Sequence, residues 1–172
     1  ISDCLVGSEM CIRDRKDTDY TNELDSKKFY GDLDNKPILE EFCKGCEVVV
    51  HSAAMISIGF ESYDEVFQVN YIGTKNLLET CIKHKVKKFI FISSVNAYNK
   101  KSSSEKFDET RELVKKGNTY DLTKAMAQDL VINAPEIEKV SINPTSVLGK
   151  YDFKPSRLCL LYTSDAADDD HC

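Results

Sequence analysis

Several features that would assign a protein to a membrane or to an export pathway are missing from these 172 residues. No apolar run approaches the roughly 18 residues that a membrane-spanning helix needs. The start of the chain has no basic region followed by an apolar core of about 7 to 15 residues, as a signal peptide would. Internal repeats and low-complexity segments are also missing. These absences favour a soluble, cytoplasmic protein without membrane contact.

The net charge of the chain is small once its two ends are set aside. The whole chain carries a net charge of −6, but residues 1–15 contribute −1 and residues 158–172 contribute −4. The middle therefore carries −1, which matches neither a basic nucleic-acid-binding stripe nor an acidic tail. We expect no nucleic-acid partner, and the sequence leaves the oligomeric state open.

The two ends also differ from the middle in composition. Neither end has the period of a helix or a strand, and together they hold four of the seven cysteines: Cys4, Cys11, Cys159 and Cys172. The segment Leu5–Arg15 (LVGSEMCIRDR) resembles one reading frame of a transposon-end sequencing adapter, and Cys159–Asp169 (CLLYTSDAADD) resembles the complementary strand. We therefore expect residues 1–15 and 158–172 to be adapter-derived and residues 16–157 to be an internal gene fragment. Its 142 residues suffice for one domain with a core.

The remaining cysteines are Cys43, Cys46 and Cys81, and the first two form the motif CKGC. This motif could be a redox pair or half of a zinc site. A zinc site needs a second pair of ligands, which His51 and His84 do not supply at a recognisable spacing. We favour two small residues in a turn before a buried strand, and we expect no metal.

Between the ends, the apolar pattern alternates between strand and helix. We predict a strand ending at Gly31-Asp32 and apolar strands in EVVVHSAA, KKFIFISS and KVSINPT. We predict helices in KPILEEFCKG, over Tyr63–His84 and from near Tyr120. On the long helix one face carries Phe67, Asn70, Thr74, Leu77, Leu78 and Cys81. Such alternation indicates an α/β fold whose parallel strands are covered on both faces.

Two tyrosine-lysine pairs have the spacing Y-x-x-x-K, namely Tyr71 with Lys75 and Tyr120 with Lys124. Ligands of parallel α/β sheets bind beyond the carboxyl ends of the strands. The helix after KKFIFISS can bring Tyr120 to that edge, which Asp32, Ser52 to Ala54, Ser93, Ser94 and Asn143 also reach. Tyr71 has no upstream hydroxyl with which to share a substrate. We therefore interpret Tyr71 as packing, Lys75 as solvated, and Tyr120 with Lys124 as the functional pair.

The ordered set of Ser94, Tyr120 and Lys124 with HSAA, VNYIGT and INPTSVLG resembles the extended short-chain dehydrogenase/reductases of the NAD-dependent epimerase/dehydratase family. The run NPTSVLGKYDFKPSR is most similar to the dihydroflavonol-reductase-like branch. The resemblance implies a Rossmann-like, doubly wound parallel sheet. It also implies that NAD or NADP is bound by Asp32, Leu33, Ser52, Ala53, Ala54, Asn70, Tyr120, Lys124, Asn143 and Pro144. The choice between the two cofactors stays open.

The implied chemistry is the reduction of a ketone or aldehyde, or the oxidation of the alcohol, on a small molecule. Tyr120 would donate the proton, and Lys124 would lower the pKa of Tyr120 and hydrogen-bond the ribose. Ser94 would hold the carbonyl, and Ser93 is the weaker candidate because the family uses the later serine. Asp32 and Leu33 would flank the adenine, while Asn143 and Pro144 would border the nicotinamide.

The sequence departs from the family in one respect that affects the fold. It contains no G-x-x-G-x-x-G, so we expect an incomplete sheet that lacks the first two strands and the glycine-rich loop. Val48–His51 would then be an exposed sheet edge. Asn99, where sugar-nucleotide enzymes carry glycine, disfavours a nucleotide-sugar epimerase or dehydratase, which remains the main alternative. A non-catalytic, cofactor-sensing protein is a third possibility.

Overall fold

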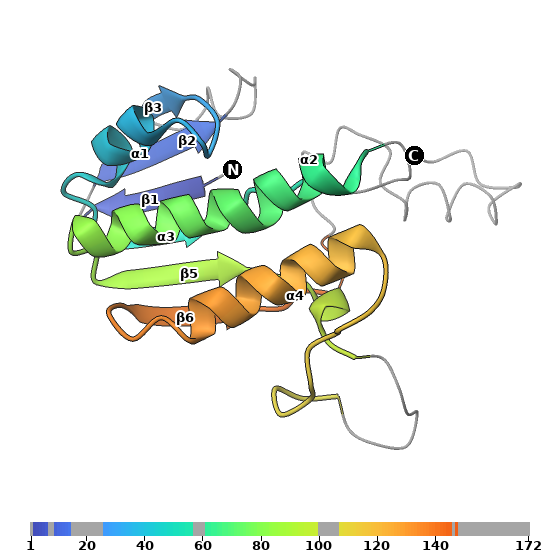
Figure 1. Ribbon diagram of the computed structural model, residues 1–172. Coiled ribbons are helices and arrows are strands. Elements are labelled where there is room, and N and C mark those ends of the chain that lie inside the picture. The colour runs from blue at the N-terminus through green and yellow to red at the C-terminus, as the bar shows by residue number, and fades with distance from the viewer. Residues whose placement is uncertain are drawn as a thin grey trace, which may run out of the picture.

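A computed structural model describes residues 2–6, 9–14, 26–56, 61–99, 107–145 and 147. Its strands are β1 (Ser2–Val6), β2 (Glu9–Asp14), β3 (Ser26–Tyr30), β4 (Val48–His51), β5 (Lys88–Ile92) and β6 (Glu138–Ile142). Its longer helices are α1 (Lys36–Cys43), α2 (Tyr63–Phe67), α3 (Gly73–Lys83) and α4 (Thr119–Ile132). The strands form one sheet in the order β3-β2-β1-β4-β5-β6 (Figure 1). The predicted α/β fold is confirmed.

Side-chain caps fix where the helices begin. The side chain of Asn35 accepts a hydrogen bond from the Ile38 amide before α1, and Pro37 lies in the first turn, where its missing N–H costs nothing. Ser62 and Glu65 form a capping box at the start of α2. At α4, the Asn118 side chain accepts a 2.9 Å hydrogen bond from the Asp121 amide. This cap sets Tyr120 in the first turn of α4.

The predicted helix over Tyr63–His84 exists, but it contains a π-helical turn, η2 (Gln68–Ile72), between α2 and α3. The predicted face is confirmed for Asn70, Thr74, Leu77, Leu78 and Cys81, which are all buried. It is wrong at its first position, because Val66 is buried and Phe67 is half-buried. A π turn holds more residues than an α turn, so it shifts the buried face by one residue.

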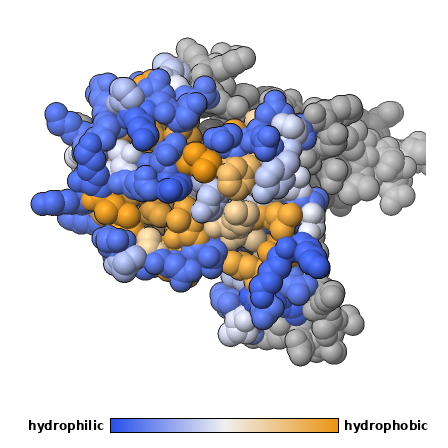
Figure 2. Space-filling model, viewed as in Figure 1, coloured by the Kyte–Doolittle hydropathy of each residue, from blue (hydrophilic) through white to orange (hydrophobic). Residues whose placement is uncertain are grey.

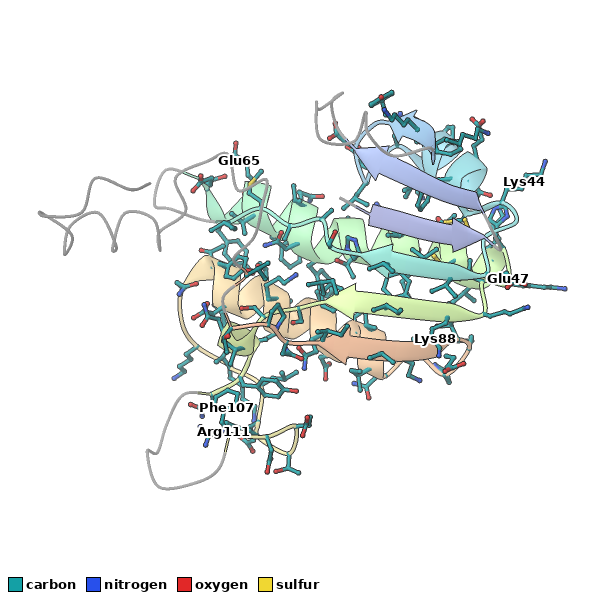
Figure 3. The ribbon with its side chains drawn as sticks, turned by 180° about the vertical axis from the view of Figure 1, so that it is seen from behind. Lys44, Glu47, Glu65, Lys88, Phe107 and Arg111 are labelled. Carbon is teal, nitrogen blue, oxygen red and sulfur yellow. The ribbon has the colours of Figure 1, made fainter. Side chains whose placement is uncertain are left out.

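The described helices all lie on one face of the sheet, as Figures 1 and 3 show from opposite sides. The chain crosses from β3 to β4, from β4 to β5 and from β5 to β6, and each crossover moves in the same direction across the sheet. Because crossovers between parallel strands are right-handed, their helices lie on the same face. Under the helices Val49, His51, Phe89 and Phe91 are fully buried, whereas the residues between them are half-buried. The described helices therefore cover one face of the sheet, where coverage of both faces was expected.

The prediction that Val48–His51 would form a sheet edge is also wrong. β1 pairs antiparallel with β4, with Ser2 opposite His51, and β2 continues the sheet towards β3. The strands β1 and β2 come from residues for which no strand was expected. Backbone N–H and C=O groups need partners, and an extended segment supplies them whatever its side-chain pattern. Because two residues join β1 to β2, no crossover helix stands between them.

The CKGC motif lies in a turn between α1 and β4, as predicted. Gly45 has a positive φ of 81°, and the side chains of Cys43 and Cys46 are buried. Cys43 is a free thiol whose Sγ lies 3.7 Å from that of Cys81. Among the described residues, no group of three or more His, Cys, Asp or Glu side chains could hold a metal ion. Within the same residues, none of the helices has the length and apolarity to cross a membrane.

Tyr71 packs and Lys75 is solvated, as the sequence predicted. Tyr71 stacks on Phe67 with 5.0 Å between ring centroids, and Lys75 forms an exposed ion pair with Glu79. Tyr71 also lines a groove of about 450 Å³ between α3 and α4, where Figure 2 shows apolar side chains gathered. This groove lies along the helices, away from the carboxyl ends of the strands.

Candidate active site

The strands β3, β4, β5 and β6 run parallel to one another, so their carboxyl ends share one edge of the sheet. Ser52, Ala53 and Ala54 follow β4 directly and are half-buried. Ser93 and Ser94 follow β5, and they are 4% and 8% exposed. The half-buried residues Asn143 and Pro144 follow β6. The structure thus brings these predicted residues together at the edge that α4 also reaches.

Lys124 lies one helical turn after Tyr120 on α4, and its side chain is almost fully buried. Its Nζ donates a hydrogen bond of 2.7 Å to the backbone carbonyl of Ile92, at the end of β5. The same Nζ lies 4.5 Å from the centroid of the Phe91 ring, at cation-π distance. Burial lowers the pKa of Lys124 from 10.5 to about 8.

The side chain of Ser94 lies near the phenol of Tyr120 and influences its pKa. Burial raises the pKa of Tyr120 above its ordinary value of 10.0, the charge of Asp121 adds to this, and the Ser94 side chain acts in the opposite direction. The sequence-based expectation was a lowered pKa through Lys124. The structure gives the opposite direction, because burial dominates and the Lys124 ammonium is bound to the Ile92 carbonyl.

Ser94 starts the short 3-10 helix η3 (Val95–Ala97). Its Oγ accepts a hydrogen bond of 3.2 Å from the Asn96 amide, which fixes the rotamer of the side chain. The neighbouring Ser93 Oγ is buried and has no hydrogen-bond partner among the described residues. A buried hydroxyl without a partner is uncommon in proteins, and this one lies at the same edge of the sheet.

Asn70 joins the segment after β4 to α4. Its side chain is 1% exposed, and its Oδ1 accepts a hydrogen bond of 2.7 Å from the Met55 amide. Its Nδ2 donates to the Met55 carbonyl at 3.0 Å and to Thr123 Oγ1 at 3.1 Å. Asn70 lies in the π turn, so the irregular turn aims this amide at both segments. The side chain therefore sets the distance between Ser52–Ala54 and the helix that carries Tyr120.

Asp32 and Leu33 lie apart from the residues on α4. Asp32 is exposed after β3, which is three strand positions from β4, or roughly 14 Å at the usual strand spacing. Leu33 is buried against α3, because its side chain contacts Gly73 and its carbonyl accepts a hydrogen bond of 3.1 Å from Asn76. Leu33 is therefore mainly a packing residue, and Asp32 is the accessible member of this pair.

Two polar residues that sequence reasoning missed are buried at the site, Thr123 and Gln128. Thr123 accepts the hydrogen bond from Asn70, and Gln128 contacts Asn143 and Tyr98. Gln128 could have been found from its spacing, since it follows Lys124 by four residues on the same helical face. Thr123 gave no such signal, because its partner lies 53 residues earlier in the chain.

Comparison with known proteins identifies the family of this chain. The profile of the 3-beta hydroxysteroid dehydrogenase/isomerase family matches residues 9–157, which is most of the chain. The chain belongs to the 3-beta hydroxysteroid dehydrogenase/isomerase family. The predicted resemblance to extended short-chain dehydrogenase/reductases is thereby confirmed.

This family member is similar to sterol demethylase protein B of Methylococcus capsulatus. It is 29% identical over 150 residues, which are 84% of this chain and 45% of that protein. The 3 beta-hydroxysteroid dehydrogenase/Delta 5-->4-isomerase of vaccinia virus, strain Ankara, is 26% identical over 133 residues, 70% of this chain and 38% of that enzyme. The chain thus spans less than half the length of these relatives.

A solved structure with the same fold is the Bordetella bronchiseptica enzyme WbmG in complex with NAD and UDP. The TM-score is 0.75 at 18% identity, over 91% of this chain and 51% of that one. At this identity the likeness concerns the fold alone. It supports a Rossmann-like sheet for the described part of this family member.

Proposed function

We propose that this chain carries the catalytic residues of an NAD(P)-dependent oxidoreductase that interconverts a secondary alcohol and a ketone. The observation that carries the proposal is the placement of the Ser94 side chain beside the phenol of Tyr120, with Lys124 one turn along the same helix. Two neighbouring hydroxyls can bind one carbonyl oxygen from two sides. Family membership supports this assignment.

The described residues fit one end of a dinucleotide cofactor better than the other. The short side chains of Ser52, Ala53 and Ala54 leave room beside the backbone, and the unsatisfied Ser93 Oγ offers a hydrogen bond. These residues, with Lys124 and Asn143, would hold the nicotinamide-ribose end of NAD or NADP. The pyrophosphate end lacks its usual site, because the sequence has no glycine-rich motif and β1 joins β2 without a helix.

The cofactor, when bound, supplies or accepts the hydride, and the protein must handle the proton. In the reductive direction, an alkoxide develops on the substrate oxygen and takes the proton of the Tyr120 hydroxyl. Because the pKa of Tyr120 is raised, the phenol is protonated near neutral pH and ready to donate. Ser94 would donate a hydrogen bond to the same oxygen and so stabilise its negative charge.

Lys124 would act on Tyr120 electrostatically. Its positive charge would favour the phenolate left after proton transfer, an effect that burial of the Tyr120 phenol outweighs in the structure. A pKa of about 8 leaves most Lys124 side chains charged at pH 7. The hydrogen bond to Ile92 holds the ammonium in place. The remaining ammonium protons are available to the cofactor ribose.

Two substrate classes are candidates, and a hydroxysteroid or sterol is favoured over a nucleotide sugar. A hydroxysteroid or sterol fits the family description and the name of the Methylococcus relative. A nucleotide sugar is the second candidate, because a protein with the same fold was solved with NAD and UDP. Asn99, which replaces the glycine expected in sugar-nucleotide enzymes, speaks against the second class.

We further propose that residues 16–157 are an internal gene fragment, so the test uses an extended chain in which flanking coding sequence continues them at both ends. It is incubated with NAD⁺ or NADP⁺ and, in separate arms, with a 3β-hydroxysteroid, a dihydroflavonol or UDP-glucose. Reduced cofactor is followed by absorbance and products by mass spectrometry. A 3-keto steroid supports the favoured class, and an altered UDP-sugar supports the alternative. Unchanged turnover in Tyr120→Phe would refute the catalytic assignment in either case.

A further inference from the structure

Gln128 lies on the same face of α4 as the proposed catalytic pair. Tyr120, Lys124 and Gln128 follow one another at intervals of four residues, so they occupy successive turns. Gln128 is 4% exposed, although glutamine is usually a surface residue. A buried amide costs free energy unless its polar atoms are hydrogen-bonded, so its partners indicate what it is for.

The amide of Gln128 joins the segment after β5 to the segment after β6. Its Nε2 donates a hydrogen bond of 3.0 Å to the hydroxyl of Tyr98, two residues beyond Asn96. Its Oε1 accepts one of 2.6 Å from Asn143 Nδ2. Because a donor faces Tyr98, the oxygen of Gln128 must face Asn143. The orientation of one amide thus fixes the orientation of the other.

Asn143 passes this constraint to Ser94. Its Nδ2 also donates a hydrogen bond of 2.8 Å to the backbone carbonyl of Ser94. Two backbone hydrogen bonds run beside it, from the Ser93 amide to Ile142 and from the Val95 amide to Pro144. The Ser94 turn therefore rests on the segment after β6, and the amide of Gln128 ties that segment to the helix that carries Tyr120.

Tyr98 is a firm anchor at the other side of Gln128. It is 8% exposed, it forms an isolated β-bridge with Leu113, and its ring meets that of Phe107 edge-on at 5.8 Å. The guanidinium of Arg111 in turn covers the Phe107 ring at 4.5 Å, and Figure 3 shows these two side chains close together. Because the backbone and ring of Tyr98 are held by these neighbours, its hydroxyl can set the position of its hydrogen-bond partner.

We propose that Gln128 is a positioning residue that sets the distance between Ser94 and Tyr120 through Asn143 and Tyr98. The inference rests on the proposed function, in which Ser94 and Tyr120 bind the same substrate oxygen. It assigns no contact between Gln128 and the substrate. Its effect is to keep the two hydroxyls at a separation at which both reach one oxygen.

The decisive variant is Gln128→Met in the extended chain, since methionine has nearly the same length and volume but lacks both amide atoms. The control is Val131→Ala, which removes methyl groups from the fully buried Val131 on the same helix and touches no polar partner. Tyr98→Phe removes one end of the linkage. The measurements are turnover with NAD⁺ and a 3β-hydroxysteroid, and titration of the Tyr120 phenol by ¹³C NMR.

Gln128→Met is expected to lower kcat by roughly tenfold or more, because small misplacements of reacting groups are costly. The Tyr120 titration should move to higher pH, because the Ser94 side chain that lowers the Tyr120 pKa would lie farther from the phenol. Tyr98→Phe should change both readouts in the same direction, and the double variant should be no worse than Gln128→Met alone. Val131→Ala should lower the melting temperature and leave the titration unchanged.

The inference is overturned if the Tyr120 phenol titrates at the same pH in Gln128→Met as in Val131→Ala. This result needs no substrate, so it stands even if no steroid is turned over. If Ser94→Ala and Tyr120→Phe both leave turnover intact, it is the proposed function that fails. If those two variants are inactive while Gln128→Met has normal kcat, KM and titration, the positioning role alone is wrong.

Discussion

The ammonium of Lys124 donates a 2.7 Å hydrogen bond to the carbonyl of Ile92, and so ties α4 to the end of β5 inside the protein. This buried cation is costly, as its pKa of about 8 indicates. The unfolded chain, with an ordinary lysine pKa of 10.5, binds more protons than the folded chain between these two values. The free energy of unfolding should therefore rise with pH in this window.

Lys124→Met is expected to remove that rise. The full difference between a pKa of 10.5 and one of about 8 corresponds to on the order of 3 kcal/mol, part of which appears between pH 8 and 10. Urea unfolding of the extended chain at pH 7, 8 and 9 measures it. Working below pH 10 avoids the opposite effect of Tyr120, whose raised pKa makes the protein less stable above that pH. The exposed Lys75→Met is the control, and a Lys124→Met variant that keeps the parent slope contradicts the account.

Tyr120→Phe should reduce turnover of the extended chain by at least about 100-fold, the usual range for the loss of a general acid. Cofactor affinity should stay nearly unchanged, because the phenyl ring fills the same space. Lys124→Met should weaken both turnover and cofactor binding. Steady-state kinetics and a fluorescence titration with NADH separate the two effects. The control is Tyr71→Phe, which makes the same chemical change at a residue that packs along the helices. Its turnover should stay within a few fold of the turnover of the parent chain.

Gly73→Ala should destabilise the fold by about 1 to 3 kcal/mol, the usual cost of overpacking. A Cβ at this position would lie 2.7 Å from Leu33 Cδ1 and 2.8 Å from Leu33 Cβ, and the latter atom cannot move without the backbone. Gly117→Ala is a matched control, because the nearest atom to its Cβ would be Asp121 Cβ at 3.9 Å. Thermal unfolding compares the two. Equal melting temperatures would mean that α3 can move away from Leu33 at little cost.

The 172-residue chain itself should bind NADH and NADPH weakly. The residues proposed for the nicotinamide end are present, but the glycine-rich motif is absent from this sequence and β1 meets β2 without a helix. Isothermal titration calorimetry of this chain beside the extended chain is the measurement. Tight, saturable binding by a monodisperse sample of the shorter chain would show that the glycine-rich loop is dispensable here.

The parts of the fold that follow from local pattern were predictable from the sequence. Apolar runs such as Val48–His51 marked the strands, and Asn118 before an amphipathic segment marked the start of α4. Choosing Tyr120 over Tyr71 needed one more rule, that parallel strands collect functional groups at their carboxyl ends. These features depend on a few neighbouring residues or on topology, which a sequence displays directly.

The remainder depended on partners that are distant in the sequence. β1 was missed because its pairing with β4 is made by backbone groups, which every residue carries. The side-chain linkage from Gln128 to Asn143 and Ser94 spans 15 residues in one step and 49 in the next, so no short motif reports it. The pKa of Tyr120 is raised and not lowered as expected, because burial, which no sequence pattern quantifies, outweighs the effect of the Ser94 side chain.

The π turn at Gln68–Ile72 divides the long helix into α2 and α3, whose residues are rotated relative to each other about the helix axis. Each residue of an α-helix advances about 100° around the axis, so deleting one residue here would rotate Tyr63–Phe67 by about that angle against α3. Val66 would then leave the core. The π turn changes the rotation of the helix about its axis. As a result one continuous helix buries Val66 and Asn70 towards α4 and also packs Leu77 and Cys81 against the sheet.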